Sequence, residues 1–269
     1  MTTLSGIRLL LTRTAEDCAA WEGPLVQAGA AVTCWPCIRT EVIDDAATQA
    51  ALMQAISTAD WLILTSRRGV DAVEQLIPAG ALSDSVRIAV VGQATAEAAI
   101  RAFGRVDHIG SGTAASLAAE LTALVANEAE ATEEHDASGN ELRPAARHFV
   151  AAVAANAADV LGKSLAVKGS RFTRVDVYRT VPLPPAAERT ALADLKVDAI
   201  LFASPSTVTG FMNQIATDSP IRAYSIGPTT SKALRKAGLT VSAEAQMPTI
   251  DGMIAIIAED SNQAGGPTP

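Results

Sequence analysis

The sequence predicts an α/β protein made of two similar domains, each built on a mostly parallel β-sheet covered by helices. Short apolar runs alternate with helical segments along almost all of the 269 residues, which is the pattern of repeated βα units. A chain of this length suits two domains of ordinary size. In addition, several segments recur at a nearly constant spacing, which indicates an internal duplication.

The duplication is clearest in two strand–turn–helix junctions. Asp60–Ser66 (DWLILTS) resembles Asp198–Ser204 (DAILFAS), which follows 138 residues later. Arg87–Gly92 (RIAVVG) resembles Arg222–Gly227 (RAYSIG), which follows 135 residues later. Matches at almost one offset indicate two copies of one α/β unit rather than chance similarity.

The first segment of the chain has the pattern of a βαβ unit. Ile7–Thr12 is a continuous apolar run, typical of a strand that is buried on both faces. Ala15–Ala28 is predicted as a helix, with Thr14 as its N-cap and Gly29 as its end. A second strand is predicted at 31–35, and such a unit by itself favours a parallel sheet.

Similar elements follow up to residue 177. We expect strands at 38–43, 61–65, 87–91, 148–153 and 172–177, and helices at 46–58, 66–76, 94–103, 112–125 and 157–167. Residues 127–143 are rich in Glu, Ala and Asn without an apolar period, so a flexible insertion is expected there.

The pattern resumes after Pro182. We expect strands at 198–203, 222–226 and 239–242, and helices at 186–195, 204–215, 229–236 and 249–258. The tail from Ser261 is rich in Gly, Pro, Asn and Gln and is predicted to be disordered.

Two short segments are predicted to link the domains. Ile38-Arg39-Thr40 resembles Tyr178-Arg179-Thr180, 140 residues later. We interpret them as paired strands through which the chain leaves one domain and returns, with Tyr178 at the mouth of an interdomain cleft. From the residues alone, either each half of the chain is one domain or the halves exchange pieces at this ribbon.

Composition excludes several classes of function. The formal net charge is −8, which argues against a nucleic-acid binder, since such proteins need a basic face. No apolar run approaches the length of a membrane span, and the N-terminus lacks the order of a signal peptide. Three cysteines fit a reduced compartment better than a disulfide framework. We therefore expect a cytoplasmic protein, and a monomer, since no exposed apolar stripe stands out.

Polar residues gather where the predicted parallel strands end and helices begin. These ends share one edge of a sheet, and helix N-termini there favour carboxylates or phosphates. The candidate donors are Thr65, Ser66, Thr95, Ser204, Ser206, Thr207, Thr229 and Thr230. Alternatively, each hydroxyl only caps its own helix. Arg13, Arg67 and Arg68 could meet anionic groups at the same edge, or simply be solvated.

Other motifs point to no chemistry. The junctions at Gly92 and Gly227 lack both the three-glycine dinucleotide pattern and a Gly-Lys-Ser/Thr phosphate loop. Cys34-Trp35-Pro36-Cys37 has the spacing of a redox pair, but it ends a strand instead of opening a helix, so we interpret its cysteines as incidental. The three histidines are scattered, and neither metal-ligand spacing nor a catalytic triad is indicated.

Taken in order, seven short segments resemble the uroporphyrinogen-III synthase family. They are Leu11–Arg13, Trp61–Ser66, Val91–Ala96, Val177–Thr180, Phe202–Val208, Ile226–Thr230 and Pro248–Thr249. The resemblance implies two flavodoxin-like α/β domains joined by a two-stranded β-ribbon. One domain comprises 1–36 and 182–260, the other comprises 41–177, and the ribbon comprises 37–40 and 178–181, followed by a disordered tail at 261–269.

The resemblance also implies an activity. A member of this family acts without a cofactor on hydroxymethylbilane, a linear tetrapyrrole, closing the macrocycle with inversion of ring D and loss of water. It would be a lyase of haem and related tetrapyrrole biosynthesis, and could meet hydroxymethylbilane synthase transiently. A non-catalytic protein that binds a small molecule in the same cleft is the alternative.

The resemblance assigns roles to particular residues. Tyr178 is the expected catalytic acid, assisting the leaving hydroxyl. The expected substrate-binding residues are Arg13, Thr65, Ser66, Gly92, Thr95, Ser204, Ser206, Gly227, Thr229 and Thr230. The strand at 148–153 departs from the family pattern, because Ala152 and Val153 supply no donor where relatives carry a polar end.

Overall fold

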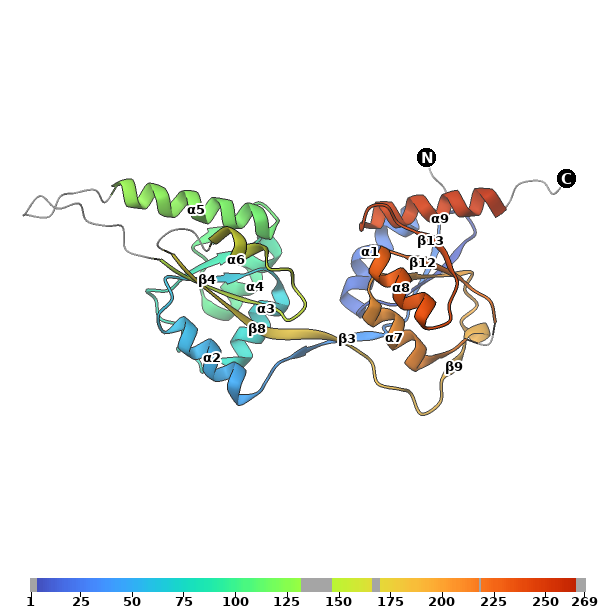
Figure 1. Ribbon diagram of the computed structural model, residues 1–269, viewed down its shortest axis with the longest axis horizontal. Coiled ribbons are helices and arrows are strands. Elements are labelled where there is room, and N and C mark those ends of the chain that lie inside the picture. The colour runs from blue at the N-terminus through green and yellow to red at the C-terminus, as the bar shows by residue number, and fades with distance from the viewer. Residues whose placement is uncertain (1–3, 132–146, 166–169, 218, 265–269) are drawn as a thin grey trace, which may run out of the picture. The chain divides into compact units, whose positions relative to one another are not determined.

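The chain folds into two compact units (Figure 1). This computed structural model describes residues 4–131, 147–165, 170–217 and 219–264. Unit 1 comprises Met1–Thr40 and Thr180–Pro269, and unit 2 comprises Glu41–Arg179. The chain therefore passes between the units twice, once within β3 (Ile38–Val42) and once within β8 (Arg171–Pro182), which are neighbouring strands.

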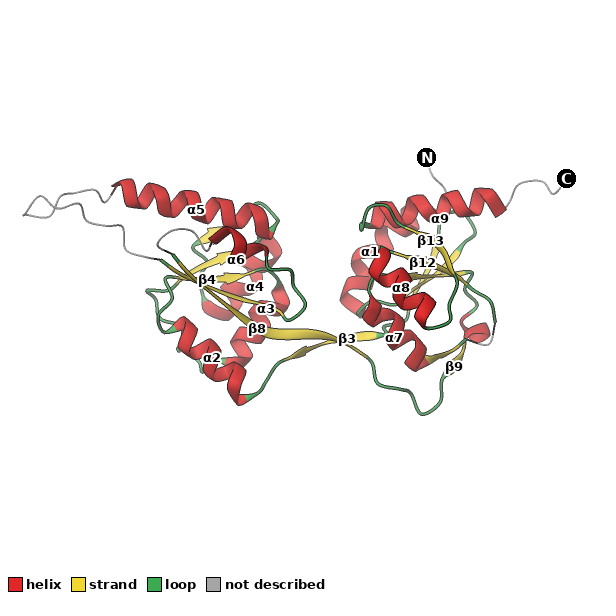
Figure 2. Ribbon diagram, viewed as in Figure 1, coloured by secondary structure: helices red, strands yellow, loops and turns green. Residues whose placement is uncertain are grey.

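Unit 1 is a parallel sheet between two layers of helices (Figure 2). Its strands are β1 (Arg8–Leu11), β2 (Ala31–Cys34), β10 (Ala199–Phe202), β12 (Arg222–Ser225) and β13 (Val241–Glu244), in the order β13-β12-β10-β1-β2. Residues of α1 (Ala15–Gln27) and α9 (Ile250–Ala264) share one core cluster. Residues of α7 (Pro205–Gln214) and α8 (Pro228–Lys236) share the core on the other face.

Unit 2 repeats this layered architecture. Beside β3 and β8 its strands are β4 (Trp61–Leu64), β5 (Arg87–Val90), β6 (His108–Ile109) and β7 (His148–Ala154), in the order β3-β8-β7-β4-β5-β6. The helices α2 (Ala46–Ile56), α3 (Arg67–Leu76) and α4 (Gln93–Phe103) share one core cluster. The helices α5 (Ala114–Ala131) and α6 (Val160–Leu165) cover the other face.

The two sheets have the same spatial order once the strands are matched by the repeat. Unit 1 reads β2-β1-β10-β12-β13 and unit 2 reads β8-β7-β4-β5-β6. Numbered along unit 1, this is the flavodoxin-like order 2-1-3-4-5. In unit 2 the chain enters at β4 and the pair β7–β8 comes last, so its order is a circular permutation of that of unit 1.

The central strands are buried on both faces, as their apolar sequences predict. All four residues of β4 are buried: Leu62 and Leu64 face the α2–α4 layer, while Trp61 and Ile63 face the α5–α6 layer. Among the described helices, none has the length and apolar character needed to cross a membrane.

A repeated aspartate ties the amino ends of the two central strands in each sheet. Asp198, just before β10, accepts hydrogen bonds from the backbone N–H of Arg8 at 2.8 Å and from its guanidinium at 2.7 Å. Asp60, just before β4, accepts one from the N–H of His148 at 2.7 Å. The repeat therefore conserves a contact that aligns β1 with β10 and β7 with β4.

Several predicted elements are wrong in type or extent. The expected helix at 186–195 is replaced by the short strand β9 (Thr190–Ala191) and a 3-10 helix at Leu192–Leu195, and β9 pairs with β11 (Ile215–Ala216). Helix α5 continues through residues 127–131, which were assigned to the acidic insertion, and residues 132–143 lie outside the described residues.

Helix α9 likewise continues past the predicted boundary. It reaches residue 264, so 261–264 belong to the helix and not to the tail, while 265–269 lie outside the described residues. In both α5 and α9 the apolar pattern ends before the backbone helix does, which explains why the sequence placed their ends too early.

The cysteines also differ from expectation. Cys18, in the first turn of α1, forms a disulfide with Cys34, the last residue of β2, and their Cα atoms are 6.0 Å apart. The prediction of three reduced cysteines is therefore wrong for this pair. Cys37 is unbonded and buried, and burial raises the pKa of its thiol to about 12. Cys34 and Cys37 accordingly form no redox pair with each other.

Helix α7 packs directly against the backbone that leads into β3. A Cβ atom at Gly210 would lie only 1.8 Å from the carbonyl oxygen of Cys37, so only glycine fits there. That carbonyl in turn accepts a hydrogen bond from the N–H of Leu183 at 2.8 Å. Gly210 therefore allows α7 to pack closely against the segment before β3, at Cys37, which is hydrogen-bonded to the segment after β8, at Leu183.

We predict that Gly210→Ala destabilises the protein by about 1–3 kcal/mol, because the added methyl group forces backbone atoms apart. Gly23→Ala is the matched control: Gly23 also lies within a helix, α1, but a Cβ there would meet open space among the described residues. The gain in helix propensity is offset by Pro24, whose ring crowds a Cβ on the preceding helical residue, so this variant should change stability by less than about 1 kcal/mol. Urea denaturation of both variants measures this, and equal effects would contradict the packing argument.

A second prediction concerns acid. Hydrogen bonds from the Arg8 side chain and backbone lower the pKa of Asp198 from 3.8 to about 2. The ionised carboxylate therefore stabilises the fold above about pH 3.8, and this contribution disappears as the pH falls through about 2. Since the pair is partly exposed, Asp198→Asn should cost only about 0.5–1 kcal/mol at neutral pH.

Two measurements test the ion pair between Asp198 and Arg8: the pH dependence of stability, and the effect of removing Arg8. In urea denaturation, the difference between wild type and Asp198→Asn should vanish near pH 2. In the background of Arg8→Met, Asp198→Asn should cost less at neutral pH, because the charged partner is absent. A cost that is the same at all pH values would contradict the ion-pair origin.

Candidate active site

Parallel pairing gathers the candidate residues of each unit at one edge of its sheet, which we call the carboxyl edge. In unit 1, Thr12 and Arg13 follow β1, Ser204 lies just after β10, and Gly227 lies just after β12. Strands β1 and β10 are where the chain direction across the sheet reverses, and ligands of open α/β sheets bind outside such a point. Thr12 is buried there and donates from its hydroxyl to the Leu201 carbonyl at 2.9 Å.

Unit 2 has the corresponding edge. Thr65 and Ser66 follow β4, and Gly92 lies just after β5. In β8 a register shift after Val153 pairs Ala154 with Tyr178. Tyr178 is thereby brought level with the end of β7, next to the reversal point between β7 and β4.

Tyr178 contacts Ser66 directly. Their hydroxyl oxygens are 2.9 Å apart, and Ser66 Oγ also accepts a hydrogen bond from the Gly69 N–H at 3.1 Å, which caps α3. Tyr178 is 8% exposed and belongs to the apolar core beneath α3. The phenol is thus held by ring packing and by one hydroxyl contact at the carboxyl edge.

A glycine makes room for this arrangement. A Cβ atom on Gly69 would lie 3.2 Å from the Ala152 carbonyl oxygen and 3.9 Å from Cε1 of Tyr178. The first turn of α3 can therefore lie close to both β7 and the Tyr178 ring. No local sequence pattern indicated this role for Gly69.

The N-termini of the helices that follow β4, β5, β10 and β12 are of two kinds, and each unit has one of each. Ser66 caps α3, and Ser204 caps α7 in a reciprocal capping box with Thr207. At α4 and α8 the N-cap residues are Gly92 and Gly227, which offer no side chain to the first N–H groups. The first turns of α4 and α8 are thereby open to an external anion. At α8 the anion would meet the N–H of Thr229, because Pro228 has none and the Gly227 N–H donates to Ser225 Oγ.

The Gly227 turn is held by a buried serine that the sequence analysis missed. Ser225 Oγ donates to the Gly227 carbonyl at 2.8 Å and accepts from the Gly227 N–H at 3.2 Å and from Ser231 Oγ at 2.9 Å. The repeat equivalent in unit 2 is Val90, which cannot form such bonds. A polar residue at the end of an apolar strand was the available signal.

The predicted binding residues differ in accessibility. Thr95 and Thr230 are only 5% and 1% exposed, so their hydroxyls face the interior and do not present donors at the carboxyl edge. Thr229 is exposed, and the residues that are partly exposed are Arg13, Thr65, Ser66, Gly92, Ser204, Ser206 and Gly227. Ser206 lies 2.8 Å from Ser204, oxygen to oxygen, so these two hydroxyls form a pair.

Arg13 is oriented by the first turns of α1. Its guanidinium lies over the indole of Trp21, 4.4 Å from the ring centroid, and is 3.4 Å from the Asp17 carboxylate. A cation–π contact and an ion pair together restrict this side chain, which remains 25% exposed. Arg13 is therefore a positioned cation at the carboxyl edge of unit 1.

A second cation was not predicted. Arg174 of β8 donates to the carbonyls of Ala154 at 3.0 Å and Ala157 at 2.8 Å, and its Nε donates to Asp176 at 2.7 Å. It thus organises the loop that follows β7. The alternation of Arg174 and Asp176 on one face of the strand could have indicated the pair.

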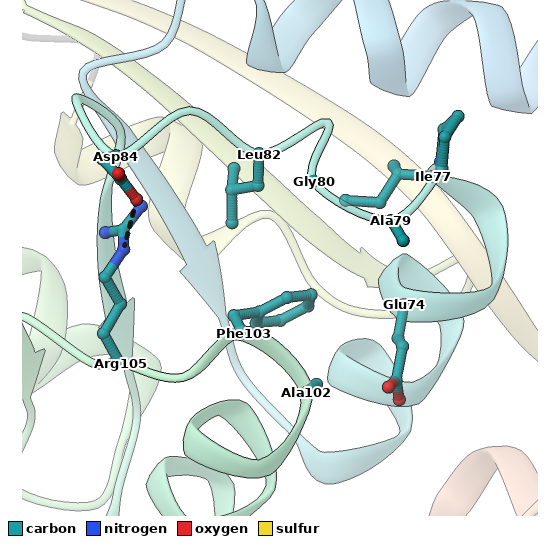
Figure 3. A pocket seen from close by; sticks show the side chains of 10 residues that line it. Glu74, Ile77, Ala79, Gly80, Leu82, Asp84, Ala102, Phe103 and Arg105 are labelled. Atoms are coloured by element: carbon teal, nitrogen blue, oxygen red, sulfur yellow. Dashed lines mark ion pairs between the residues drawn. The ribbon is translucent and has the colours of Figure 1, made fainter.

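A hollow of about 270 Å³ in unit 2 lies elsewhere (Figure 3). It is formed by the segment after α3 and the end of α4, with Leu82 and Phe103 inside and the Asp84–Arg105 pair at its rim. In a parallel α/β sheet the C-termini of the helices lie near the amino ends of the strands. This hollow is therefore at the amino edge of the sheet, opposite the carboxyl edge that carries Ser66 and Gly92. It contains none of the predicted site residues.

Among the described residues, no group of three or more His, Cys, Asp or Glu side chains is placed to hold a metal ion. The chemistry available at the carboxyl edges includes hydroxyls, backbone N–H groups, arginines and one phenol. Fold and site thus define a protein of two flavodoxin-like units, each with hydroxyls and helix N-termini at the carboxyl edge of its sheet.

Comparison with known proteins identifies the family. Residues 19–255 match the family model described as "Uroporphyrinogen-III synthase HemD". The chain is 28% identical to the uroporphyrinogen-III synthase of Synechococcus elongatus over 275 aligned positions, covering 97% of both proteins. The chain belongs to the uroporphyrinogen-III synthase family.

Solved structures show a similar fold. The uroporphyrinogen-III synthetase of Helicobacter pylori superposes with a TM-score of 0.53 at 14% identity, covering 94% of this chain and 99% of that one. A mutant uroporphyrinogen III synthase from Thermus thermophilus gives a TM-score of 0.49 at 16% identity, covering 96% and 100%. The Helicobacter match supports the predicted fold class at low sequence identity.

Proposed function

We propose that this protein is a uroporphyrinogen-III synthase that converts hydroxymethylbilane into uroporphyrinogen III and water. Family membership along 19–255 is the observation that carries the proposal. The composition of the carboxyl edges supports it, because closure of this substrate requires orientation and few charged catalytic groups.

The chemistry begins with loss of the hydroxyl group from ring A. The pyrrole nitrogen of that ring supplies the electron pair, which leaves an electrophilic azafulvene, and an acid that protonates the departing oxygen yields water. The substituted carbon of ring D then attacks, giving a spiro intermediate that fragments and closes again with ring D inverted. No external oxidant, reductant or cofactor is needed for this balance.

Tyr178 is the proposed acid. Its hydroxyl is 2.9 Å from Ser66 Oγ, and Ser66 already accepts from the Gly69 N–H. If Ser66 donates its own proton to the phenol oxygen, the phenol proton is directed away from the protein. Ser66 therefore positions Tyr178, while Tyr178 protonates the leaving hydroxyl.

The substrate carboxylates are proposed to bind at the carboxyl edges of the units. In unit 1 the contacts are Arg13, the Ser204–Ser206 hydroxyl pair, Thr229 and the backbone at Gly227. In unit 2 they are Thr65, Ser66 and the backbone at Gly92. Thr95 and Thr230 are best regarded as buried helix residues that support these turns, since both are nearly inaccessible.

A monomeric protein of the cytoplasm remains the prediction for assembly and location. Large exposed apolar side chains are few and scattered among the described residues, including Val26, Ile100 and Met247, which gives a second copy little to cover. Sedimentation measurements test the monomer. Transient contact with hydroxymethylbilane synthase is part of the same prediction and can be tested by adding that enzyme.

The identity of the product isomer tests the function. Purified protein mixed with freshly made hydroxymethylbilane should yield mainly the type III isomer, since only an oriented closure inverts ring D. Isomers are separated by chromatography after oxidation to porphyrins. Formation of the type I isomer alone, at the rate of the protein-free reaction, would refute the proposal. Saturable binding without conversion would favour the non-catalytic alternative.

Tyr178→Phe should lower turnover by about 10- to 100-fold, below the usual range for a required general acid, because the pyrrole nitrogen itself drives departure of the hydroxyl. Tyr224→Phe is the matched control. Tyr224 is the other tyrosine of the chain; it is buried in unit 1 and donates to Asp260 at 2.7 Å. Its loss should affect stability and not turnover.

Ser66→Ala should reduce kcat less than Tyr178→Phe, and the double variant should have a kcat no lower than that of Tyr178→Phe alone, because Ser66 acts on the leaving step only through the phenol. Loss of Ser66 as a substrate contact should instead raise KM. Loss of the α3 cap should also cost about 1 kcal/mol of stability, so folding is checked by circular dichroism. Independent, multiplicative effects of the two substitutions would contradict the positioning role.

A further inference from the structure

The disulfide between Cys18 and Cys34 has one accessible and one inaccessible end. Cys34 is exposed at the end of β2, an edge strand of the unit 1 sheet. Cys18 is only 2% exposed, within the first turn of α1. A thiolate from solution can therefore reach the sulfur of Cys34 and not that of Cys18.

The backbone positions of both cysteines are held independently of the S–S bond. Cys34 pairs with Leu11 in the parallel ladder, and the next residue continues the ladder through the Trp35 N–H and the Leu11 carbonyl at 2.9 Å. The Cys18 N–H donates to the Thr14 carbonyl at 2.9 Å at the start of α1. Cleavage of the bond therefore leaves the βαβ unit intact, and the sulfurs stay close enough to bond again.

The surroundings also accommodate the reduced state. The sulfur of Cys18 lies 3.8 Å from the Arg13 carbonyl and 3.9 Å from the Leu11 carbonyl, so a thiol formed there has acceptors for its proton. As a thiolate it would lie near the N-terminal end of a helix, which favours negative charge. The neighbouring Asp17 opposes this, but Arg13 pairs with that carboxylate.

The third cysteine does not interfere. Cys37 lies three positions after Cys34 but is fully buried, and its thiol has a pKa of about 12. It is therefore a poor nucleophile at neutral pH and cannot readily exchange with the bond. Only Cys18 and Cys34 therefore take part in exchange, and Cys37 stays a free thiol throughout.

We propose that Cys18 and Cys34 form a reversible thiol–disulfide site in the folded protein, at which low-molecular-weight thiols of the glutathione class react at Cys34. A small-molecule thiolate attacks Cys34 Sγ, the Cys18–Cys34 bond breaks, and Cys18 leaves as a thiolate that takes a proton from water. A second small thiolate attacks the outer sulfur of the mixed disulfide. The protein disulfide is thereby reduced to two thiols, and two small thiols are oxidised to one disulfide.

Equilibration of the whole chain in mixtures of reduced and oxidised glutathione tests the proposal. Free thiols are trapped in acid, alkylated after unfolding and counted by mass spectrometry, while circular dichroism monitors the fold. The count should rise from one, Cys37, to three as the mixture becomes reducing, with the fold retained throughout. Three free thiols in the most oxidising mixture, or reduction only after unfolding, would overturn the proposal.

Two variants identify the sulfurs. Cys37→Ser should go from no free thiol to two across the same mixtures, and peptide mapping of oxidised wild type should show the 18–34 link if this variant folds poorly. Cys18→Ser should retain one glutathione on Cys34 in oxidising mixtures, because the internal sulfur that would displace it is missing. Absence of the adduct, or its appearance on Cys37, would contradict attack at Cys34.

Discussion

The pairing of β1 with β10, and of β7 with β4, is the contact on which the candidate chemistry depends. At these pairs the helices leave the sheet on opposite faces, so the carboxyl edge is open to a ligand. An aspartate at the amino end aligns each pair, Asp198 in unit 1 and Asp60 in unit 2. If the pair in unit 2 slipped in register, Tyr178 and Ser66 would no longer be in contact, and in unit 1 the ends of β1 and β10 would no longer be level.

Much of the fold could be predicted because short stretches of sequence determine the type and the ends of most elements. Short apolar runs such as 61–64 favour buried strands, and Ser66 and Ser204 are typical helix caps, so strand ends and helix starts follow from residue types. The internal repeat also predicted that there are two similar units. By contrast, the segment 186–195 is rich in Ala and Leu and favours a helix locally, but tertiary pairing of β9 with β11 decided its backbone.

Parts of the site could not be predicted because they depend on contacts between distant residues. Tyr178 and Ser66 are 112 positions apart, and only the register shift in β8 brings them together. The same holds for Cys18 and Cys34, whose bond follows from the position of β2 beside β1. Burial of Thr95 and Thr230 depends on how each helix is rotated about its axis, which its short sequence leaves open.

The similarity of the two units makes their differences informative. Tyr178 occupies the position of Ile38 in the repeat, and Ser225 occupies that of Val90. The disulfide belongs to unit 1 alone among the described residues. A duplicated scaffold has therefore acquired a phenol in one unit and a serine-supported turn in the other. Inversion of only one of four rings requires such a lack of symmetry.

The double passage of the chain through β3 and β8 also constrains the order of folding. Unit 2 ends at Arg179, before β10 is synthesised, so it can fold on the ribosome while unit 1 is still incomplete. Its two ends are then neighbours, joined by the hydrogen bond from the Ile43 N–H to the Val177 carbonyl at 2.9 Å. Closing an unstructured loop of this length would cost about 4 kcal/mol of chain entropy. A folded unit 2 removes most of that cost, so prior folding of unit 2 favours assembly of unit 1.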